Sequence, residues 1–563
     1  MLANFLLIAI VLSISAHAGP EPLRASADTR PFHAPAKTVG VIFAIGASLV
    51  LIKAAYVQVF HDSAMMGAGT LVMQADGVRR YEYNPRFQEI IREIPKGTIF
   101  DSNGLPVATS NWNELEKHRA EYEQLGIDID RACPRADTRY YPFGGLMFDL
   151  LGDLRTRTRW GASNTSFLER DSARRLRGYD DRPMLVDVKN PQTGAVEHTI
   201  RYDYRELVPL LRHRHEPGNP EVRKVLDRPR DVRMSIDVRL QLKVAEILHG
   251  QLQKAGKVNG AAVVIDVATG DLLASVSYPL PSQEPSSGTP ETNPYLDRAR
   301  YGLYPPGSTF KVVTAMAALR KDAGLTHKRY ECIRLPDGRV GNNVHGSRRP
   351  VRDDVQDRSP HGSVDMEHGI VVSCNAFFAQ LGAYDVGAKP LFDTANLLGI
   401  LAAAPNTAAQ LRKSLPQSSY GQGQVLATPF QMARVAATVA NNGNFLQGRW
   451  ITDETNTRTA APVSVLGPEA AQTLARFMRE AVTSGTGMRA LEAAAPIAGK
   501  TGTAELAQAP SHAWFIGYAP YGATSRKIAF SVLVENGVYG GTTAAPAAAE
   551  IVNASVELGL IRP

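Results

Sequence analysis

The chain begins with two apolar segments that differ in length and charge. Residues 38–60 carry a single charged side chain, Lys53, and a helix of this length spans the roughly 30 Å hydrocarbon core of a bilayer. We therefore predict a transmembrane anchor at residues 38–60, with a buried core helix as the alternative. Residues 1–18 are uncharged and end in Ala-His-Ala, the form of a signal-peptidase site, but no Lys or Arg precedes their apolar run. We interpret residues 1–18 as a signal-like segment or an extra membrane span.

Positive charges flank the predicted anchor unevenly. Arg24, Arg30 and Lys37 precede it, whereas Lys53 is the only such charge within it. Because cytoplasmic segments next to a membrane span carry an excess of Lys and Arg, we expect residues 19–37 in the cytoplasm. Everything after residue 60 is then expected outside the cytoplasm.

The region after the anchor is polar and irregular up to about residue 230. It contains dense arginine runs at residues 155–182 and 212–239. The stretch 216–230 holds three prolines and a glycine, which is typical of a domain boundary. We therefore predict a separate N-terminal domain at residues 61–230.

Residues 231–563 have the patterns of a domain with both helices and strands. Apolar periodicity predicts helices at 240–252 and 544–558, with mostly helical sequence between residues 301 and 440. β-Rich runs predict strands at 260–265, 272–276, 500–505, 513–518 and 528–533. Strands at both ends with helices between them predict an α+β fold whose sheet is closed by segments far apart in sequence.

The composition is that of an ordinary globular protein with more than one domain: 563 residues, 44% hydrophobic and 21% charged. The formal net charge of +7 comes mainly from arginine. A solvated protein surface explains this positive charge. Alternatively, the arginines attract anionic lipid headgroups, pyrophosphate-linked precursors or wall polymers. Nucleic acid is not expected as a partner, because the predicted orientation places the arginine runs outside the cytoplasm.

Three cysteines, Cys133, Cys332 and Cys374, match no metal-ligand spacing, so neither a metal nor a cofactor is expected. In an oxidising compartment they allow one disulfide and leave one thiol over. Cys374 is interpreted as a small buried residue. The isolated His361 and His512 are interpreted as structural or surface residues.

Ser308 and Lys311 form the first candidate catalytic motif. The preceding Pro-Pro-Gly ends any earlier helix, and the residues that follow favour a helix, so Ser308 is expected near a helix N-terminus. The spacing places Ser308 and Lys311 on one helix face. A neutral lysine can take the proton of a serine hydroxyl and turn it into a nucleophile.

Two further motifs complete the candidate site. Ser373 and Asn375 flank Cys374; a second hydroxyl can relay a proton, and a side-chain amide can hold a peptide bond. The third motif is Lys500, Thr501, Gly502 and Thr503. On a strand, Thr501, Thr503 and Glu505 would share one face, and a glycine at the sheet edge would let a peptide add alongside as a further strand.

In this order the motifs resemble the S-x-x-K, S-x-N and K-T-G elements of penicillin-binding proteins and class A β-lactamases. Other segments resemble successive blocks of the penicillin-binding transpeptidase domain over nearly all of residues 231–563: GAAVVIDVATGDLLASVSYP, HGSVDMEHGIVVSCNAFF, YGQGQVLATPFQMA, SGTGMRALEAAAPIAGKTGTAE and HAWFIGYAP. The segment IPKGTIFDSNGLPVATS at 94–110 is similar to an R-G-x-I-x-D-R-x-G element of class B members, with Lys96 and Ser102 in place of two arginines. No stretch resembles the glycosyltransferase domain of class A members, which favours a monofunctional enzyme.

The resemblance implies a fold and a function. The fold is a penicillin-binding, serine β-lactamase-like transpeptidase domain at 231–563, with a central antiparallel sheet and helices, preceded by an elongated pedestal at 61–230 and the anchor. The function is that of a peptidoglycan D,D-transpeptidase of the bacterial inner membrane, with its catalytic domain in the periplasm. Its expected partners are peptidoglycan stem peptides, β-lactam antibiotics, the membrane and a polytopic glycosyltransferase.

The resemblance also implies residue roles. Ser308 is the nucleophile, Lys311 the general base, and Ser373 with Asn375 assists proton transfer and positioning. Lys500, Thr501 and Thr503, with Gly502 between them, bind the substrate carboxylate and polarise the site. The backbone N–H groups of Ser308 and Thr503 form the oxyanion hole.

Two other functions use the same motifs. A D,D-carboxypeptidase or β-lactamase-like hydrolase would pass the acyl group to water, and acceptor choice is not encoded in the motifs. A scaffold or sensor of wall synthesis would bind partners without turnover. The roughly twenty residues between the apolar segments are too few for a cytoplasmic output domain, which disfavours a sensor.

Overall fold

The computed structural model describes residues 33–60, 66–152, 167–190, 194–281, 293–452 and 461–563. The interpretation of residues 1–18, and part of the arginine run at 155–182, lie outside the described residues. The chain divides into two compact units, Met1–Asn84 with Arg182–Val208, and Pro85–Asp181 with Pro209–Pro563. Both units are discontinuous in sequence. The division into domains at residue 230 stays a prediction.

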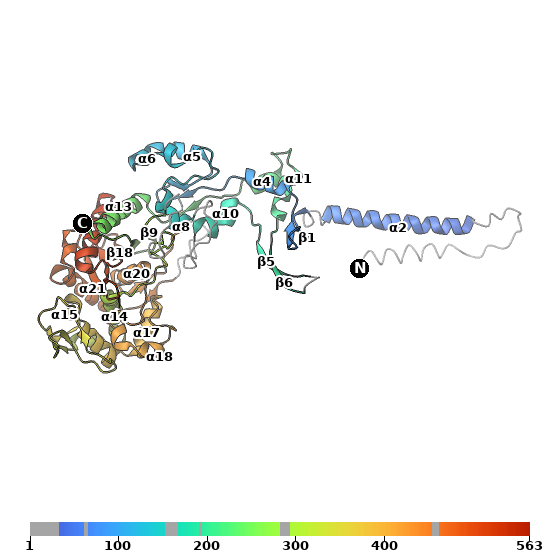
Figure 1. The fold of residues 1–563 in the computed structure, drawn as a ribbon. Coiled ribbons are helices and arrows are strands. Elements are labelled where there is room, and N and C mark those ends of the chain that lie inside the picture. The colour runs from blue at the N-terminus through green and yellow to red at the C-terminus, as the bar shows by residue number, and fades with distance from the viewer. Residues whose placement is uncertain (1–32, 61–65, 153–166, 191–193, 282–292, 453–460) are drawn as a thin grey trace, which may run out of the picture. The chain divides into compact units, whose positions relative to one another are not determined.

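The first unit contains the predicted anchor and two hairpins (Figure 1). Helix α2 (His33–Phe60) includes Lys37–Tyr56, which has a mean hydropathy of 2.1 and no buried residue. A core helix would be buried, so the exposure of these apolar side chains favours the anchor. The hairpins pair β1 (Thr70–Met73) with β2 (Arg79–Glu82), and β5 (Met184–Lys189) with β6 (Val196–Arg201).

Helices and short strands from the N-terminal half open the second unit. Its three-stranded sheet has the order β4-β3-β7, with β3 (Ile99–Phe100) antiparallel to β4 (Pro106–Ala108) and parallel to β7 (Val232–Arg233). The helices of this part are α4 (Arg86–Glu93), α5 (Trp112–Lys117), α6 (Arg119–Gln124), α7 (Ile129–Ala132), α8 (Phe148–Leu151), α9 (Leu168–Asp171), α10 (Ala173–Arg177) and α12 (Pro220–Leu226), and α11 (Val208–Arg212) begins at the last residue of the first unit. Helix α12 lies within the proline-rich stretch 216–230, where the side chain of Asn219 caps its first turn (3.0 Å to Glu221 N).

A five-stranded antiparallel sheet forms the centre of the second unit, in the order β16-β17-β18-β8-β9. Its strands are β8 (Gly260–Asp266), β9 (Leu272–Tyr278), β16 (Ala498–Ala504), β17 (His512–Ala519) and β18 (Ile528–Val534). Segments more than two hundred residues apart therefore pair side by side, with Val534 opposite Gly260. This confirms the predicted α+β fold and the predicted strands.

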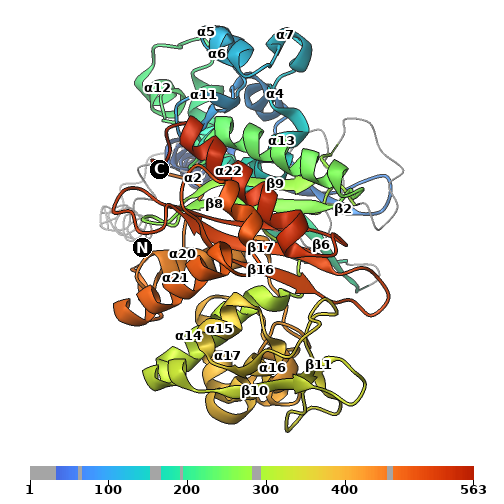
Figure 2. The same cartoon turned by 90° about the vertical axis from the view of Figure 1, so that its left-hand side faces the viewer.

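Alternate residues of the sheet enter two different cores. Ala262 and Val264 pack with α13 (Val238–Lys254) and α22 (Ala545–Glu557), which lie beside each other over the sheet in Figure 2. Ala261 and Val263 belong to the other core, which includes α20 (Pro429–Ala440). Burial on both faces explains why β8 reads as a continuous apolar run.

A region of helices and a small sheet connects β9 to β16. Its helices agree with the helical pattern predicted between residues 301 and 440, whereas the four short strands between residues 330 and 364 were not predicted. Its helices are α14 (Lys311–Lys321), α15 (Met366–Val371), α16 (Asn375–Gln380), α17 (Ala388–Leu397), α18 (Ala408–Arg412), α19 (Leu415–Ser418), α20 and α21 (Pro468–Thr483). A small sheet in the order β12-β11-β10-β13 lies among them: β10 (Tyr330–Arg334), β11 (Val340–Asn342), β12 (Val351–Arg352) and β13 (Gly362–Val364). The strands β14 (Asn444–Phe445) and β15 (Val463–Ser464) pair separately.

Candidate active site

Ser308 lies in a 3-10 turn, η4 (Gly307–Phe310), that leads directly into helix α14. The turn is held by the side chain of Thr309, which donates to the carbonyl of Pro306 (2.7 Å). The indole of Trp514 on β17 donates to the carbonyl of Pro305 (3.1 Å). The predicted position of Ser308 near a helix N-terminus is therefore confirmed.

Two glycines allow the serine turn to touch its neighbours through the backbone. Gly307 has a φ of +53°, and a Cβ there would lie 2.5 Å from the carbonyl oxygen of Thr503. Gly421, with a φ of +83°, would place a Cβ 1.9 Å from the carbonyl oxygen of Gly307, and the Gly307 N–H donates to the Gly421 carbonyl (3.0 Å). The turn is thus fixed between the edge strand β16 and the loop after α19.

Lys311, three residues after Ser308, is completely buried. Its ammonium donates to the carbonyl of Ser373, to Ser373 Oγ (3.2 Å) and to Asn375 Oδ1 (2.7 Å). Among the described residues, Lys311 makes no hydrogen bond to Ser308; such contacts in sites without substrate often form only in the substrate complex. The first two motifs therefore meet at the lysine.

The second lysine reaches the same hydroxyl. Lys500, on β16, is also completely buried, and it donates to Ser373 Oγ (2.8 Å) and to the carbonyl of Thr501 (3.0 Å). Ser373 has a φ of +63°, a conformation that costs energy for a residue other than glycine and that is often found at functional sites. Ser373 Oγ consequently lies between two buried ammonium groups.

Burial shifts the pKa of both lysines downward. Desolvation lowers the pKa of Lys311 to about 8, against the opposing effect of the Asp353 carboxylate. Desolvation also lowers the pKa of Lys500 well below its usual range, and the nearby charge of Lys311 lowers it further. A lysine with a pKa near 8 is neutral in about a tenth of the molecules at pH 7, far more than a lysine with an ordinary pKa, and the neutral amine is the form that a general base requires.

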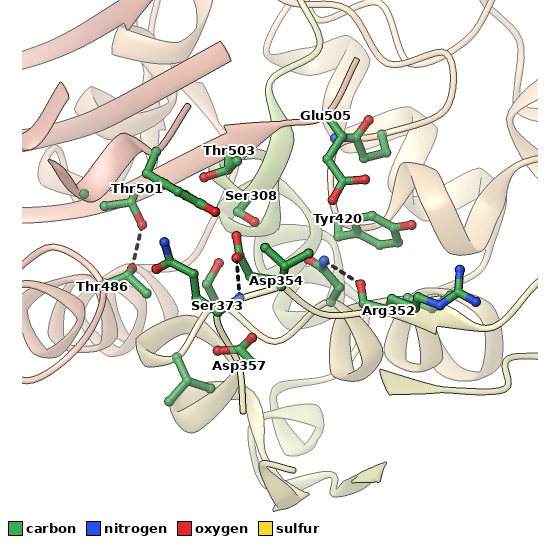
Figure 3. Close-up of a pocket in the computed structure, with 18 of the residues that line it drawn as sticks. Ser308, Arg352, Asp354, Asp357, Ser373, Tyr420, Thr486, Thr501, Thr503 and Glu505 are labelled. Atoms are coloured by element: carbon green, nitrogen blue, oxygen red, sulfur yellow. Dashed lines mark hydrogen bonds between the residues drawn. The ribbon is translucent and has the colours of Figure 1, made fainter. Parts of the chain in front are cut away.

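The strand β16 presents its threonines to a pocket of about 690 Å³. Thr501, Thr503 and Glu505 line this pocket with Ser308 and Ser373 (Figure 3), as the predicted strand alternation requires. The hydroxyls of Thr501 and Thr486 are 2.5 Å apart. Gly502 does not line the pocket; a Cβ there would lie 2.8 Å from the side chain of Thr309, so its role in the fold is close packing against the serine turn.

Several pocket residues were not predicted as site residues from the sequence. Glu505 is one of them, and its place in the alternation with Thr501 and Thr503 is the signal that assigns it to the pocket face. Tyr420 stands in the YGQG segment, and burial raises the pKa of its hydroxyl to about 12. Arg352, at the end of β12, and Asp354 and Asp357, in the loop after it, also line the pocket, and the sequence pattern holds no local signal for them.

The sequence profile described as the penicillin binding protein transpeptidase domain matches residues 260–553, more than half of the chain. The chain belongs to this family. The peptidoglycan D,D-transpeptidase PbpA of Mycolicibacterium smegmatis is 31% identical over 371 residues, which cover 58% of this chain and 73% of that protein. The peptidoglycan D,D-transpeptidase MrdA of Acinetobacter baumannii is 29% identical over 495 residues, 75% of this chain and 66% of that protein.

Solved structures agree with the assignment. The crystal structure of PBPA from Mycobacterium tuberculosis matches with a TM-score of 0.58 at 25% identity, covering 82% of this chain and 99% of that one. The penicillin G acyl-enzyme complex of penicillin-binding protein A from M. tuberculosis matches equally well, with the same TM-score. The chain is therefore a class B penicillin-binding protein.

The contact between the serine turn and β16 can be tested with Gly307→Ala. The new Cβ would meet the Thr503 carbonyl oxygen, so we expect the rate of labelling by a fluorescent penicillin to fall on the order of 100-fold. Gly338→Ala is the matched control, because Gly338 also has a positive φ (+80°) but a Cβ there meets nothing within 4 Å. Equal labelling rates for the two variants would contradict the proposed fit of the turn.

Proposed function

We propose that this class B penicillin-binding protein is a peptidoglycan D,D-transpeptidase that cross-links stem peptides through an acyl-enzyme on Ser308. The observation that carries the proposal is that Ser308 lines the same pocket as Ser373, whose hydroxyl accepts hydrogen bonds from the two buried lysines Lys311 and Lys500. This arrangement supplies a nucleophile, a base and a proton relay in one place.

The acylation step follows from these positions. Ser308 Oγ attacks the carbonyl carbon of the penultimate D-alanine, and its proton passes to the neutral amine of Lys311. The new ester bond forms as the peptide C–N bond breaks, and the leaving D-alanine amine receives a proton through Ser373 Oγ, which lies between Lys311 and Lys500.

The edge strand β16 supplies the binding surface for the donor peptide. An extended peptide can pair with this edge, and the hydroxyls of Thr501 and Thr503 then meet its terminal carboxylate. Lys500 is buried and does not line the pocket itself. It adds positive potential to the site and positions Ser373 through its hydrogen bond to Ser373 Oγ. The backbone N–H groups of Ser308 and Thr503 form the oxyanion hole.

The second half-reaction transfers the acyl group to an amine. An amino group of a neighbouring stem peptide attacks the ester on Ser308, which regenerates the hydroxyl and forms the cross-link. Asn375 keeps the base in place, because its Oδ1 accepts from Lys311 while its amide donates to the carbonyl of Arg352 (3.0 Å). A β-lactam is expected to acylate the same serine, because penicillin-binding protein A from M. tuberculosis, a structural relative, forms an acyl-enzyme complex with penicillin G.

The location of the enzyme is part of the proposal. Helix α2 anchors the chain in the bacterial inner membrane, with the catalytic region in the periplasm; the excess of Lys and Arg before the helix supports this orientation. Residues 61–230 act as the pedestal of a transpeptidase domain at 231–563. A polytopic peptidoglycan glycosyltransferase supplies the glycan strands that are cross-linked.

The acceptor is tested by product analysis with the detergent-solubilised full-length protein. A stem pentapeptide ending in D-Ala-D-Ala, incubated with an amine-bearing acceptor peptide, is expected to give a cross-linked dimer and free D-alanine. Ser308→Ala is expected to give neither product, whereas Ser363→Ala, an exposed position on β13, retains both. Free D-alanine without dimer would instead indicate a D,D-carboxypeptidase, and no turnover by the folded parent protein would indicate a scaffold.

The role of Lys311 predicts a pH dependence. Because burial lowers the pKa of Lys311 to about 8, the neutral amine becomes more abundant as the pH rises towards that value. The second-order rate constant for acylation by a penicillin should therefore rise roughly tenfold per unit well below pH 8 and level off above it. Lys311→Arg, which keeps its charge, should abolish acylation, and the exposed Lys389→Arg should leave the profile unchanged. A rate that is flat between about pH 6 and 9 would contradict Lys311 as the base.

A further inference from the structure

Three acidic residues line the pocket, Asp354, Asp357 and Glu505, and Glu505 differs from the other two. Asp354 accepts from the backbone N–H of Gln356 (2.9 Å), and a carboxylate oxygen of Asp357 lies 3.7 Å from the ring of His361. Within the described ranges, Glu505 forms neither a hydrogen bond nor an ion pair, and its side chain is exposed. Its negative charge is therefore available to a ligand in the pocket.

Glu505 lies at one end of the pocket, close to Tyr420. In Figure 3, Glu505 and Tyr420 lie on one side of Ser308, and Thr501 lies on the other side. Burial raises the pKa of the Tyr420 hydroxyl, and the negative charge of Glu505 raises it further, so the two side chains are near each other. The next residue, Gly421, accepts a backbone hydrogen bond from the serine turn (3.0 Å). This end of the pocket is thus held at a fixed place beside the nucleophile.

The arginines of the pocket do not neutralise Glu505 by direct pairing. Arg352 forms an ion pair with an aspartate outside the pocket (2.7 Å), and Arg339 donates to a backbone carbonyl (3.0 Å). Among the described side chains, Arg349 and Arg489 also line the pocket without an ion pair to Glu505. A cationic group of a substrate therefore meets no competing side chain at this carboxylate.

The donor peptide, bound as proposed above, leads towards Glu505. Its terminal carboxylate lies at Thr501 and its attacked carbonyl lies beside Thr503, so the peptide runs antiparallel to β16. Residues of an extended chain are about 3.4 Å apart, and alternate residues of β16 face the pocket. The residue before D-Ala-D-Ala therefore comes to the end of the strand where Glu505 stands.

The cross-linking reaction itself supplies a cation for this end of the pocket. The acceptor amine belongs to a second stem peptide of the same kind, so each donor stem also carries a side-chain amino group. An amine of the lysine type has a pKa of about 10.4 and is an ammonium at neutral pH. The flexible four-carbon stem of such a side chain lets the ammonium reach a carboxylate beyond its own backbone position.

We propose that Glu505 selects donor stem peptides by binding the side-chain ammonium of the residue before D-Ala-D-Ala. The inference rests on the proposed transpeptidase function and adds a specificity-determining residue to it. Glu505 takes no part in bond formation or proton transfer. Its carboxylate holds the donor in register on β16, so that the next carbonyl along the peptide lies at Ser308.

Two synthetic donor peptides that differ only in this charge test the selection. One carries lysine before D-Ala-D-Ala and the other carries Nε-acetyl-lysine, and kcat/KM for D-alanine release is measured with the detergent-solubilised full-length protein. D-Alanine leaves before the acceptor attacks, so this constant reports the donor. We expect the lysine peptide to be preferred on the order of fivefold, the size of a partly exposed ion pair.

Substitutions at Glu505 should change this preference in a defined direction. Glu505→Gln should treat the two donors equally, because the amide keeps the shape but not the charge. Glu505→Lys should prefer the acetylated donor. Glu557→Gln is the matched control, because Glu557 is an exposed glutamate at the end of α22 that does not line the pocket, and it should keep the preference of the parent protein.

Penicillins repeat the comparison without donor turnover. Two 6-acylaminopenicillins, one with a lysine-like acyl chain and one with its acetylated form, should acylate Ser308 with the same preference, and Glu505→Gln should lose it. If neither peptide releases D-alanine, the proposed transpeptidase fails, while the penicillin pair still tests Glu505.

Three results would overturn the proposal. The first is a parent protein that does not distinguish the two donors. The second is a preference for lysine that persists in Glu505→Gln, since the acetyl group would then act through its size. The third is an effect of Glu505→Gln that is confined to the ratio of cross-linked dimer to hydrolysed peptide, which would place Glu505 on the acceptor side.

Discussion

Two buried ammonium groups share one serine hydroxyl, and the arrangement of the catalytic region depends on this contact. Lys311 and Lys500 are both completely buried, and both donate to Ser373 Oγ. Burying a cation is costly unless polar groups surround it. Here the carbonyls of Ser373 and Thr501 and the amide oxygen of Asn375 supply them. The result is a pair of lysines with lowered pKa values, both bonded to Ser373, which lines the same pocket as Ser308.

The fold brings these groups together by closing a sheet over a long sequence distance. Strand β16 lies at the edge of the sheet beside β17, while β8 and β9, far earlier in the chain, complete the other side. Glycines at positions 307 and 421 let the serine turn approach β16 without side chains in between. The helical region brings the S-x-N motif to the same place. Three motifs that are far apart in the sequence therefore form one site.

The sequence patterns predicted the parts of the site that depend on local structure. Helical periodicity placed Ser308 at the start of a helix, and strand alternation placed Thr501, Thr503 and Glu505 on one face. The same alternation puts Lys500 on the opposite face, but its hydrogen bond to Ser373 and the left-handed backbone of Ser373 were not predictable, because both depend on packing between distant segments.

Covalent labelling of the full-length protein by a penicillin, followed by intact mass measurement and peptide mapping, tests the assignment of the nucleophile most directly. We predict a single penicilloyl adduct on the peptide that contains Ser308. An adduct on a peptide that contains Ser373 instead, or no adduct on folded protein, would contradict the role given to Ser308 and to the lysine pair.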